Sequence, residues 1–234
     1  MIPFVLLGSV LIVGVIYLFF NPLCDIYSTH KVETSRKVVA LTFDDGPDPN
    51  ITPLVLDILK KCNVRATFFV VGKNVVKYPE VLRRAFKEGH QIANHSFNHN
   101  YKMFSLPSKI LRDSMSTNEL IFQVIKKRPL FFRPPFGLKT YWGARILNKN
   151  GFKIVTWNNM TTDYLNKRPA KLVHKIVLNT KKGGIIVLHD GSEGLSVKNR
   201  SNLVESLENI IQALKAQGFQ FIRLDTMFNE DGYF

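Results

Sequence analysis

Cysteine is scarce in this chain of 234 residues, which contains two, Cys24 and Cys62. Small domains held together by disulfides carry many more cysteines, so the sequence excludes that class. Internal repeats and low-complexity tracts are also absent, and the composition is 45% hydrophobic and 21% charged. These values argue against a disordered or collagen-like chain. The length allows one large domain with a sizeable core and a smaller additional segment.

Acidic residues are also few, with 18 Asp and Glu against 32 Lys and Arg, which gives a formal net charge of +14. A charge of this size favours an anionic partner such as a nucleic acid, an acidic polymer or a membrane surface. The sequence shows no concentrated run of Lys and Arg and no recognised nucleic-acid-binding module. We therefore expect no nucleic-acid partner.

The longest stretch without charge runs from Ile2 to Phe20 and contains 19 residues, rich in Ile, Leu, Val and Phe. As a helix it would be about 28 Å long, close to the hydrocarbon thickness of a bilayer. A cleaved signal peptide has a shorter apolar core and a small-x-small cleavage pattern, which residues 20–24 lack. We expect a transmembrane anchor over residues 1–20, with a secreted protein as the alternative if the segment is cleaved.

The expected topology is a single-pass protein of the cell membrane whose remaining chain lies outside the cell. Lys31, Arg36 and Lys37 follow the apolar segment, and the positive-inside tendency would keep that side in the cytoplasm. These charges begin about ten residues beyond the apolar stretch, and long domains are translocated largely regardless of charge. The flanking charges therefore do not decide the topology.

The rest of the chain is expected to form one domain over residues 37–228, after a linker at 21–36 and before a tail at 229–234. Apolar runs alternate with amphipathic stretches, which is typical of parallel strands covered by helices. The expected strands span residues 37–42, 66–70, 91–94, 130–133, 153–157, 184–188 and 219–223. The expected helices span residues 52–61, 79–88, 108–126, 141–150, 170–180 and 202–217. A closed barrel and an open doubly wound sheet both fit this pattern.

Reactive side chains follow the carboxyl ends of these strands, where both architectures build active sites. Asp44 and Asp45 follow the first expected strand. Asp-Asp-Gly-Pro is also a turn sequence, but two adjacent carboxylates on an apolar strand repel, which favours a cation at one of them and a base at the other. His95 and His99 follow the third strand, at a spacing that brings both imidazoles to one point in a helix or a tight turn.

Two imidazoles and one carboxylate form a ligand set with open positions, which suits a metal that acts as a Lewis acid. We expect Asp45, His95 and His99 to bind a divalent metal ion. Zn²⁺ is the first expectation, with Co²⁺, Fe²⁺, Mn²⁺ and Ni²⁺ as alternatives.

Two further strands end at residues that could take part in catalysis. His189 follows an apolar run and could donate a proton to a leaving group, the alternative being a buried core histidine. Arg133 is expected to pair with an aspartate, and the two prolines after it make a rigid loop that can hold a backbone N–H in place. Several aromatic residues could line a sugar-binding groove, although most aromatic side chains belong to a core: Tyr101, Phe104, Phe136, Tyr141, Trp142, Trp157 and Tyr164.

These motifs resemble those of the polysaccharide deacetylases of carbohydrate esterase family four, which share a nodulation-protein-B homology domain. Residues 42–47, Thr-Phe-Asp-Asp-Gly-Pro, resemble the first motif of the family. Residues 95–99, His-Ser-Phe-Asn-His, and residues 133–137, Arg-Pro-Pro-Phe-Gly, resemble the second and third. Together and in this order the motifs are highly specific, and the resemblance covers about residues 37–228.

The resemblance implies a deformed (β/α) barrel of seven or eight parallel strands, and so favours the barrel over the open sheet. It implies a metal-dependent hydrolase that removes acetyl groups from N-acetylglucosamine polymers. It further implies that Asp44 is the base, that Arg133 orients Asp44, and that His189 is the acid, tuned by Asp163. Contacts to the substrate and the oxyanion are expected from Pro135, Phe136, Gly137, Tyr164 and Leu188.

The sequence departs from the family pattern in two motifs. The fourth motif usually reads Asp-x-x-Asp-Trp, whereas Met160 stands at its first Asp and Tyr164 replaces the Trp. The second motif commonly continues with Pro where this chain has Asn100. Asp163 keeps the expected partner of the catalytic histidine, so activity is still expected, while the preferred substrate is less defined.

We therefore expect N-deacetylation of cell-wall peptidoglycan, with chitooligosaccharide or exopolysaccharide deacetylation as alternatives. An alternative hypothesis from another functional class is a catalytically silent, membrane-tethered glycan-binding protein. The altered fourth motif favours this hypothesis, whereas the intact set of expected metal ligands argues against it. The expected partners are an N-acetylated glycan polymer and the membrane, and the chain is expected to be a monomer.

Overall fold

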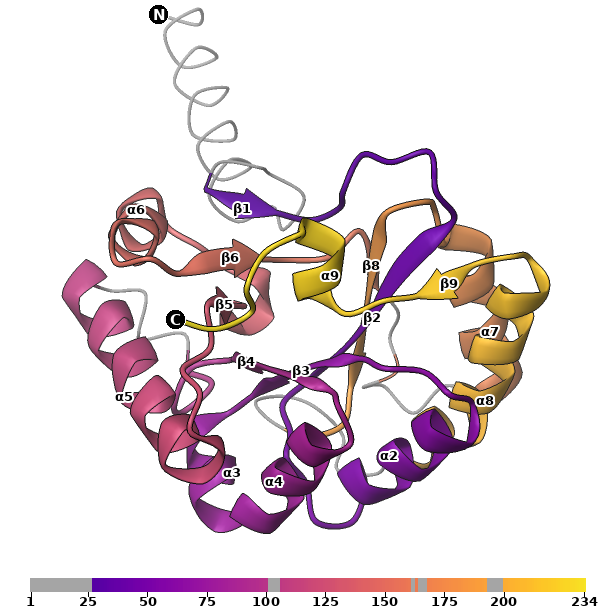
Figure 1. Cartoon of the computed structure of the whole chain (residues 1–234), viewed down its shortest axis with the longest axis horizontal. Helices are drawn as coiled ribbons and strands as arrows, with labels where there is room; N and C mark the ends of the chain where they lie inside the picture. Colours follow the sequence, from indigo (N-terminus) through magenta and orange to yellow (C-terminus); the bar gives the residue numbers. More distant parts are fainter. Residues whose placement is uncertain (1–26, 101–105, 161–162, 164–167, 193–199) are drawn as a thin grey trace, which may run out of the picture.

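The computed structural model describes residues 27–100, 106–160, 163, 168–192 and 200–234. Within them one sheet of parallel strands curls around a core, and helices cover its outside (Figure 1). The strands are β1 (Ser28–Thr29), β2 (Val38–Asp44), β3 (Thr67–Val70), β4 (Gln91–Asn94), β5 (Phe131–Phe132), β6 (Lys153–Val155), β7 (Asn159–Met160), β8 (Gly184–His189) and β9 (Gln220–Phe221).

The sheet follows the order β1-β6-β5-β4-β3-β2-β8-β7, and β9 pairs with β2 beside this path. β8 pairs along one edge of β2 from Val39 to Asp44. The other edge is shared, since β9 pairs with its first two residues and β3 with its last three. All of these ladders are parallel, so the carboxyl ends of the strands lie on the same side of the sheet.

A short stretch of chain links the two ends of the curled sheet. β6 pairs with β5, and β7 pairs with β8 at the far end of the path, yet only Thr156, Trp157 and Asn158 separate β6 from β7. The backbone N–H of Asn158 donates to the carbonyl of Ile185. The parallel, curled arrangement fits a deformed (β/α) barrel, and the open doubly wound alternative was wrong.

The helices lie close to the expected positions. They are α2 (Thr52–Lys61), α3 (Gly72–Lys77), α4 (Pro79–Lys87), α5 (Pro107–Ile125), α6 (Tyr141–Lys149), α7 (Pro169–Asn179), α8 (Ser201–Ala216) and α9 (Leu224–Phe228), with a 3-10 turn η2 (Pro135–Gly137). Four of them begin with a proline in the first two positions, where its missing N–H costs nothing. Gly89, Gly151 and Gly218 have positive φ just past α4, α6 and α8, which is the usual helix-ending conformation.

The alternation along β2 divides the core into an outer and an inner layer. Leu41 and Phe43 belong to the cluster that packs against α2 and α8. Val38 and Ala40 belong to the cluster inside the curled sheet. Successive side chains of a strand point to opposite faces, so Thr42 and Asp44 also point inward, toward the active-site end of the barrel.

The described residues of the expected linker and tail belong to the same folded unit. Ser28 and Thr29 pair with β6, and Tyr233 accepts a hydrogen bond from the backbone N–H of Ile92. None of the helices in the described ranges combines the length and apolarity needed to cross a bilayer. The expected anchor at residues 1–20 lies outside the described residues.

Candidate active site and metal centre

The reactive residues meet at the carboxyl ends of neighbouring strands. Asp44 ends β2 and is the register partner of His189, which ends β8. Asn94 ends β4 and pairs with Phe132 of β5, so the residues that follow, His95 and Arg133, are neighbours across the next ladder position. The backbone N–H of Arg133 donates to the carbonyl of Asn94 at 2.9 Å. The parallel register therefore brings four distant segments to one place.

Asp45, His95 and His99 form a compact cluster of metal-ligating atoms. Asp45 Oδ1 lies 3.6 Å from His95 Nε2 and 3.3 Å from His99 Nε2. One ligand atom from each residue lies within 4.8 Å of the others, and all three residues are buried. This is the only such group of three found in the described ranges.

The protonation of the two histidines suits a metal. Burial lowers the pKa of His95 and of His99 to about 3, so both imidazoles are neutral at physiological pH. His95 Nδ1 lies 2.7 Å from the carbonyl oxygen of Arg133, which assigns the proton to Nδ1 and leaves the lone pair on Nε2. The two neutral imidazole nitrogens and the Asp45 carboxylate point to one place, and such a set of atoms can bind a divalent cation.

The backbone around the ligands is held in an unusual conformation. Asp45, Ser96 and His99 have φ values of 75°, 69° and 50°, in the left-handed region that costs roughly 1–2 kcal/mol for a non-glycine residue. Asn74 Nδ2 donates to the carbonyl of Asp45 at 2.9 Å. The backbone N–H of Ser96 donates to Asn94 Oδ1 at 2.9 Å. These hydrogen bonds from the surrounding structure hold the strained turns in place.

Asp44 and Arg133 form a buried ion pair beside the cluster. Arg133 is fully buried, and its Nη1 donates to Asp44 Oδ1 at 2.6 Å and to Thr42 Oγ1 at 2.8 Å. Its Nε and Nη2 donate to the carbonyls of Val155 and Thr156. The guanidinium also lies 3.9 Å from the centre of the Phe69 ring. Every edge of the guanidinium is therefore occupied, and its charge stays fixed against Asp44.

The second oxygen of Asp44 faces the candidate metal ligands. Asp44 Oδ2 lies 3.8 Å from His95 Nε2, while Oδ1 is bound by Arg133. Burial raises the pKa of Asp44, and the charges of Arg133 and His189 oppose that rise. A carboxylate with a raised pKa and one oxygen aimed at the site can accept a proton there.

His189 is the third imidazole of the site and has a different partner. Its Nδ1 lies 3.0 Å from Asp163 Oδ1, and its backbone N–H donates to Asp163 Oδ2 at 2.8 Å. Burial lowers the pKa of His189, but the carboxylates of Asp163, Asp45 and Asp44 outweigh it and raise the pKa to about 9. His189 is therefore protonated at neutral pH and can donate a proton.

A family model described as polysaccharide deacetylase matches residues 31–155. The chain belongs to this family. It is 36% identical over 203 residues to a peptidoglycan-N-acetylglucosamine deacetylase of Bacillus cereus, covering 86% of this chain and 92% of that protein. It is 31% identical over 208 residues to a chitooligosaccharide deacetylase of a Bradyrhizobium species, covering 86% of this chain and 95% of that protein.

A solved structure gives the same result for the fold. The crystal structure of a peptidoglycan N-acetylglucosamine deacetylase with a bound benzamide ligand superposes with a TM-score of 0.83 at 31% identity. The match covers 89% of this chain and 95% of that one. The polysaccharide deacetylase assignment therefore rests on sequence and fold together, and the chain is an enzyme of this class.

The loop after Arg133 forms one wall of the deacetylase site. Pro135 and Gly137 are buried, whereas Phe136 has a φ of 60° and is 44% exposed. The rings of Phe136 and His99 meet edge to face with their centres 4.5 Å apart. Phe136 thus packs against a metal-ligand candidate with part of its surface open to solvent.

Leu188 and Tyr164 differ from the other expected site residues. Leu188 is fully buried in the outer core cluster, with Leu41 and Phe43. Leu188 alternates with His189 along β8, so its side chain points to the opposite face of the strand. The expectation that the Leu188 side chain contacts the substrate is therefore wrong. Tyr164 lies outside the described residues.

Several polar residues that support the site were not expected from the sequence. Asn74 and Asn94 hold the strained turns, and Thr42 joins Arg133. Asp190 is also buried, accepts a hydrogen bond from Thr52 Oγ1 at 2.6 Å, and has a pKa raised by burial to about 7. Thr42 is a polar residue inside the otherwise apolar strand β2, and this pattern is the signal that could have found it.

Proposed function

We propose that this chain hydrolyses the N-acetyl group of N-acetylglucosamine units in a polysaccharide, and that peptidoglycan is the polymer. The proposal is supported by the similarity to peptidoglycan deacetylases in both sequence and structure. It is also supported by a positive net charge of +14, which favours binding to an anionic wall polymer. The similarity to a chitooligosaccharide deacetylase makes chitin oligomers the second substrate to test.

Zn²⁺ is the proposed metal, held by Asp45, His95 and His99. The two separations measured from Asp45 Oδ1 are 3.3 and 3.6 Å. These separations let the three residues share one ion, and the nitrogen-rich ligand set favours zinc over magnesium or calcium.

The proposed reaction is amide hydrolysis, in which water adds to the acetamide carbonyl and the C–N bond then breaks. The ion, when bound, supplies Lewis acidity that lowers the pKa of a water molecule and polarises the carbonyl. Asp44 Oδ2 accepts the proton that this water loses. Arg133 holds Oδ1 of Asp44 at 2.6 Å, so the accepting oxygen keeps its direction toward the site.

The leaving amine receives its proton from His189. Asp163 keeps this imidazole protonated and oriented through Nδ1, which leaves Nε2 as the donor. The backbone N–H of Phe136, on the rigid loop after Arg133, is the proposed donor to the oxyanion, an interaction worth about 3–4 kcal/mol in other enzymes. The products are acetate and a free glucosamine unit.

One observation carries the proposal: two charge pairs, Asp44 with Arg133 and His189 with Asp163, flank one candidate metal site. The test is acetate release by the purified full-length chain from peptidoglycan and from chitin oligomers, with and without a chelator. We expect release from peptidoglycan that stops on chelation and returns with Zn²⁺. Asp44→Asn is expected to retain the metal and to lose most of the activity.

Each other outcome would change the proposal. Faster release from chitin oligomers would make them the substrate. Binding to the polymer without acetate release would instead identify a silent glycan-binding protein. Near-wild-type release by Asp44→Asn would overturn the assignment of the base.

The proposed location is the outer face of a membrane, with residues 2–20 as the anchor. Nineteen uncharged residues in this stretch are long enough to span a bilayer, and a wall polymer is reached from outside the membrane. Flotation of the full-length chain with lipid vesicles after a high-salt wash tests the anchor.

A further inference from the structure

The outer surface of α6 carries exposed aromatic and basic side chains. Gly143, Ala144 and Leu147 are the buried residues of this helix. Trp142 is 61% exposed, although large apolar side chains are usually covered. Arg145 follows Trp142 by three residues and Lys149 follows Arg145 by four, so the three share one face of the helix.

The first described residue of the chain lies against this face. The rings of Tyr27 and Tyr141 meet with their centres 5.4 Å apart, and the rings of Tyr141 and Trp142 with theirs 5.0 Å apart. Asn148 Nδ2 donates to the carbonyl oxygen of Tyr27 at 3.1 Å. Figure 1 shows the same proximity, with β1, which starts one residue later, beside α6 and β6. The point where the N-terminal segment joins the domain is therefore on the α6 surface.

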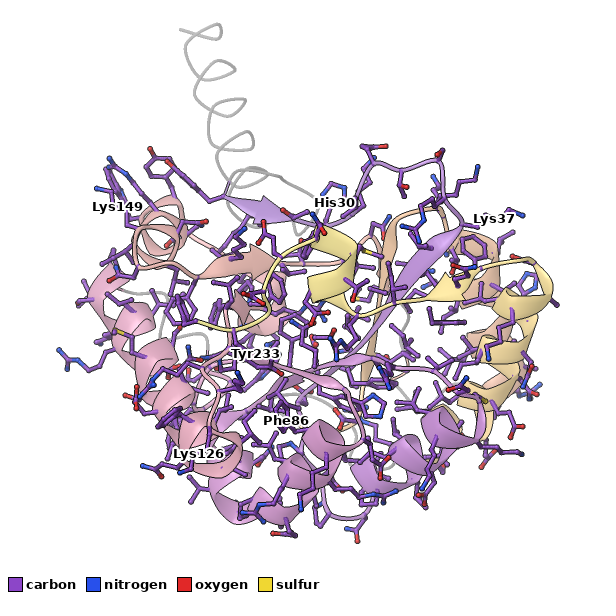
Figure 2. All side chains as sticks on the ribbon, viewed as in Figure 1. His30, Lys37, Phe86, Lys126, Lys149 and Tyr233 are labelled. Atoms are coloured by element: carbon purple, nitrogen blue, oxygen red, sulfur yellow. The ribbon has the colours of Figure 1, made fainter. Side chains whose placement is uncertain are left out.

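The charge of α6 is of one sign. Arg145 and Lys149 are its ionised residues, and the helix has no Asp or Glu. The guanidinium of Arg145 lies 5.7 Å from the centre of the Trp142 ring, and Figure 2 shows Lys149 at the periphery of the molecule. Protein surfaces at a membrane-water interface are rich in Trp and Tyr beside Lys and Arg. The basic side chains are attracted there to anionic headgroups.

The length of the connecting chain limits how far this surface can lie from a membrane. Tyr27 follows Phe20 by seven residues, and seven extended residues reach at most about 25 Å. If residues 2–20 span the bilayer, Tyr27 and the α6 surface packed against it must lie within that distance of the interface. The aromatic and basic face is thus tethered next to lipid headgroups.

We propose that the outer face of α6, formed by Tyr27, Tyr141, Trp142, Arg145 and Lys149, rests on the anionic headgroup region of the membrane that anchors the chain. This inference rests on the proposed anchor. The enzyme would then act on glycan strands that lie close to the membrane.

Tryptophan emission tests the contact directly, because the chain has two tryptophans. Trp157 is 8% exposed and packs inside the barrel, whereas Trp142 is 61% exposed on α6. The full-length chain is reconstituted into vesicles of phosphatidylcholine and phosphatidylglycerol with brominated acyl chains, which quench nearby indoles. We expect quenching in the wild type and none in Trp142→Phe, whose remaining emission comes from Trp157.

A charge reversal sharpens the test. Arg145→Glu with Lys149→Glu is expected to weaken quenching on anionic vesicles. Arg83→Glu with Lys87→Glu is the matched control, because these two basic residues have the same spacing on α4, which lies away from β1 in Figure 1. The control is expected to quench like the wild type.

The outcomes separate the anchor from the surface. A chain that floats with vesicles but shows no quenching of Trp142 would overturn the α6 contact and leave the anchor intact. A chain that fails to float would overturn the anchor, and the α6 contact with it. A shift of Trp142 emission by N-acetylglucosamine oligomers in detergent, without quenching in vesicles, would overturn the contact and identify Trp142 as a sugar platform.

Discussion

Three imidazoles lie within one site, those of His95 and His99 buried and that of His189 half-buried, and their pKa values move in opposite directions. Burial lowers the pKa of His95 and His99 to about 3. Burial acts on His189 in the same sense, but neighbouring carboxylates raise its pKa to about 9. Desolvation is common to all three, so the sum of the charges around each ring decides the direction of the shift.

The partner of Nδ1 differs between His95 and His189. His95 Nδ1 faces a neutral backbone carbonyl, that of Arg133, which orients the ring without stabilising a positive charge enough to overcome burial. His189 Nδ1 faces the carboxylate of Asp163, which does stabilise that charge. In the proposed mechanism the same type of side chain is therefore a metal ligand in one place and a proton donor in the other.

Removal of a ligand histidine is expected to have the largest effect. His99→Ala should abolish metal binding and reduce acetate release by more than about 10⁴-fold, since it removes both the Lewis acid and the water that the ion activates. Metal content by mass spectrometry and acetate release check both parts. A His99→Ala variant that keeps one equivalent of metal would show that His99 is not a ligand. The contrast between His99 as a ligand and His189 as a proton donor would then be wrong.

Removal of the proton donor should leave the metal in place. His189→Ala is expected to lower kcat by about 10²–10⁴-fold, the usual contribution of a general acid. Metal content should equal that of the wild type, measured in the same preparation as activity. Loss of the metal in this variant would place His189 among the ligands and contradict its assignment as the proton donor.

Neutralising the partner of His189 should change the pH profile. His189 acts as an acid, so activity is lost as pH rises through its folded pKa of about 9. Asp163→Asn removes the main charge that raises this pKa, and the alkaline limb of kcat against pH should move to lower pH, with a smaller loss of rate near pH 6. An unchanged alkaline limb would show that another group sets it.

The same pair predicts a dependence of stability on pH. The folded pKa of His189 lies above its ordinary value of 6.5, so its stabilising contribution is complete below pH 6.5 and is lost between 6.5 and about 9. The wild type should lose more stability than Asp163→Asn across this interval, measured by urea unfolding of the metal-free chain. Parallel stability curves would contradict the charge pairing.

The smallest expected effect concerns a residue behind the metal ligands. Asn94 Nδ2 donates to the Ser114 carbonyl and to Asn118 Oδ1, and its Oδ1 accepts from Ser96. Asn94→Ala should cost about 1–3 kcal/mol of unfolding free energy and about 10–100-fold in metal affinity. Denaturant unfolding and metal titration measure the two effects.

Asn159→Ala is the matched control for this variant. Asn159 is also buried, and its Nδ2 donates to the Ile176 carbonyl and to Thr180 Oγ1. We expect a similar loss of stability with unchanged metal affinity. Equal loss of metal affinity in both variants would mean that Asn94 acts through general stability alone.

Sequence patterns predicted the longer elements well, and the reasons are physical. α2 was expected at residues 52–61 and has those bounds, because Pro53, an amphipathic pattern and a following polar turn all agree. β1 and β7 were not expected, since two-residue strands are too short to show a period. α3 begins at a glycine and has six residues, so it also lacks a recognisable pattern.

Sequence patterns also located most of the site but not its supports. The motif residues Asp45, His95 and His99 come together as expected. Leu188 was expected to contact the substrate, whereas its side chain is fully buried in the outer core cluster. Asn74 was not expected at all, since its contact is to a backbone carbonyl 29 residues away.

The sequence by itself determined which reactive side chains follow which strands, because apolar runs and turn residues set where each strand ends. Only the tertiary structure decided their protonation and roles. Arg133 reaches Asp44 across 89 residues, and Asp163 reaches His189 across 26. A pKa depends on burial and on the charges within a few ångströms, and those neighbours exist only once the curled sheet has brought distant segments together.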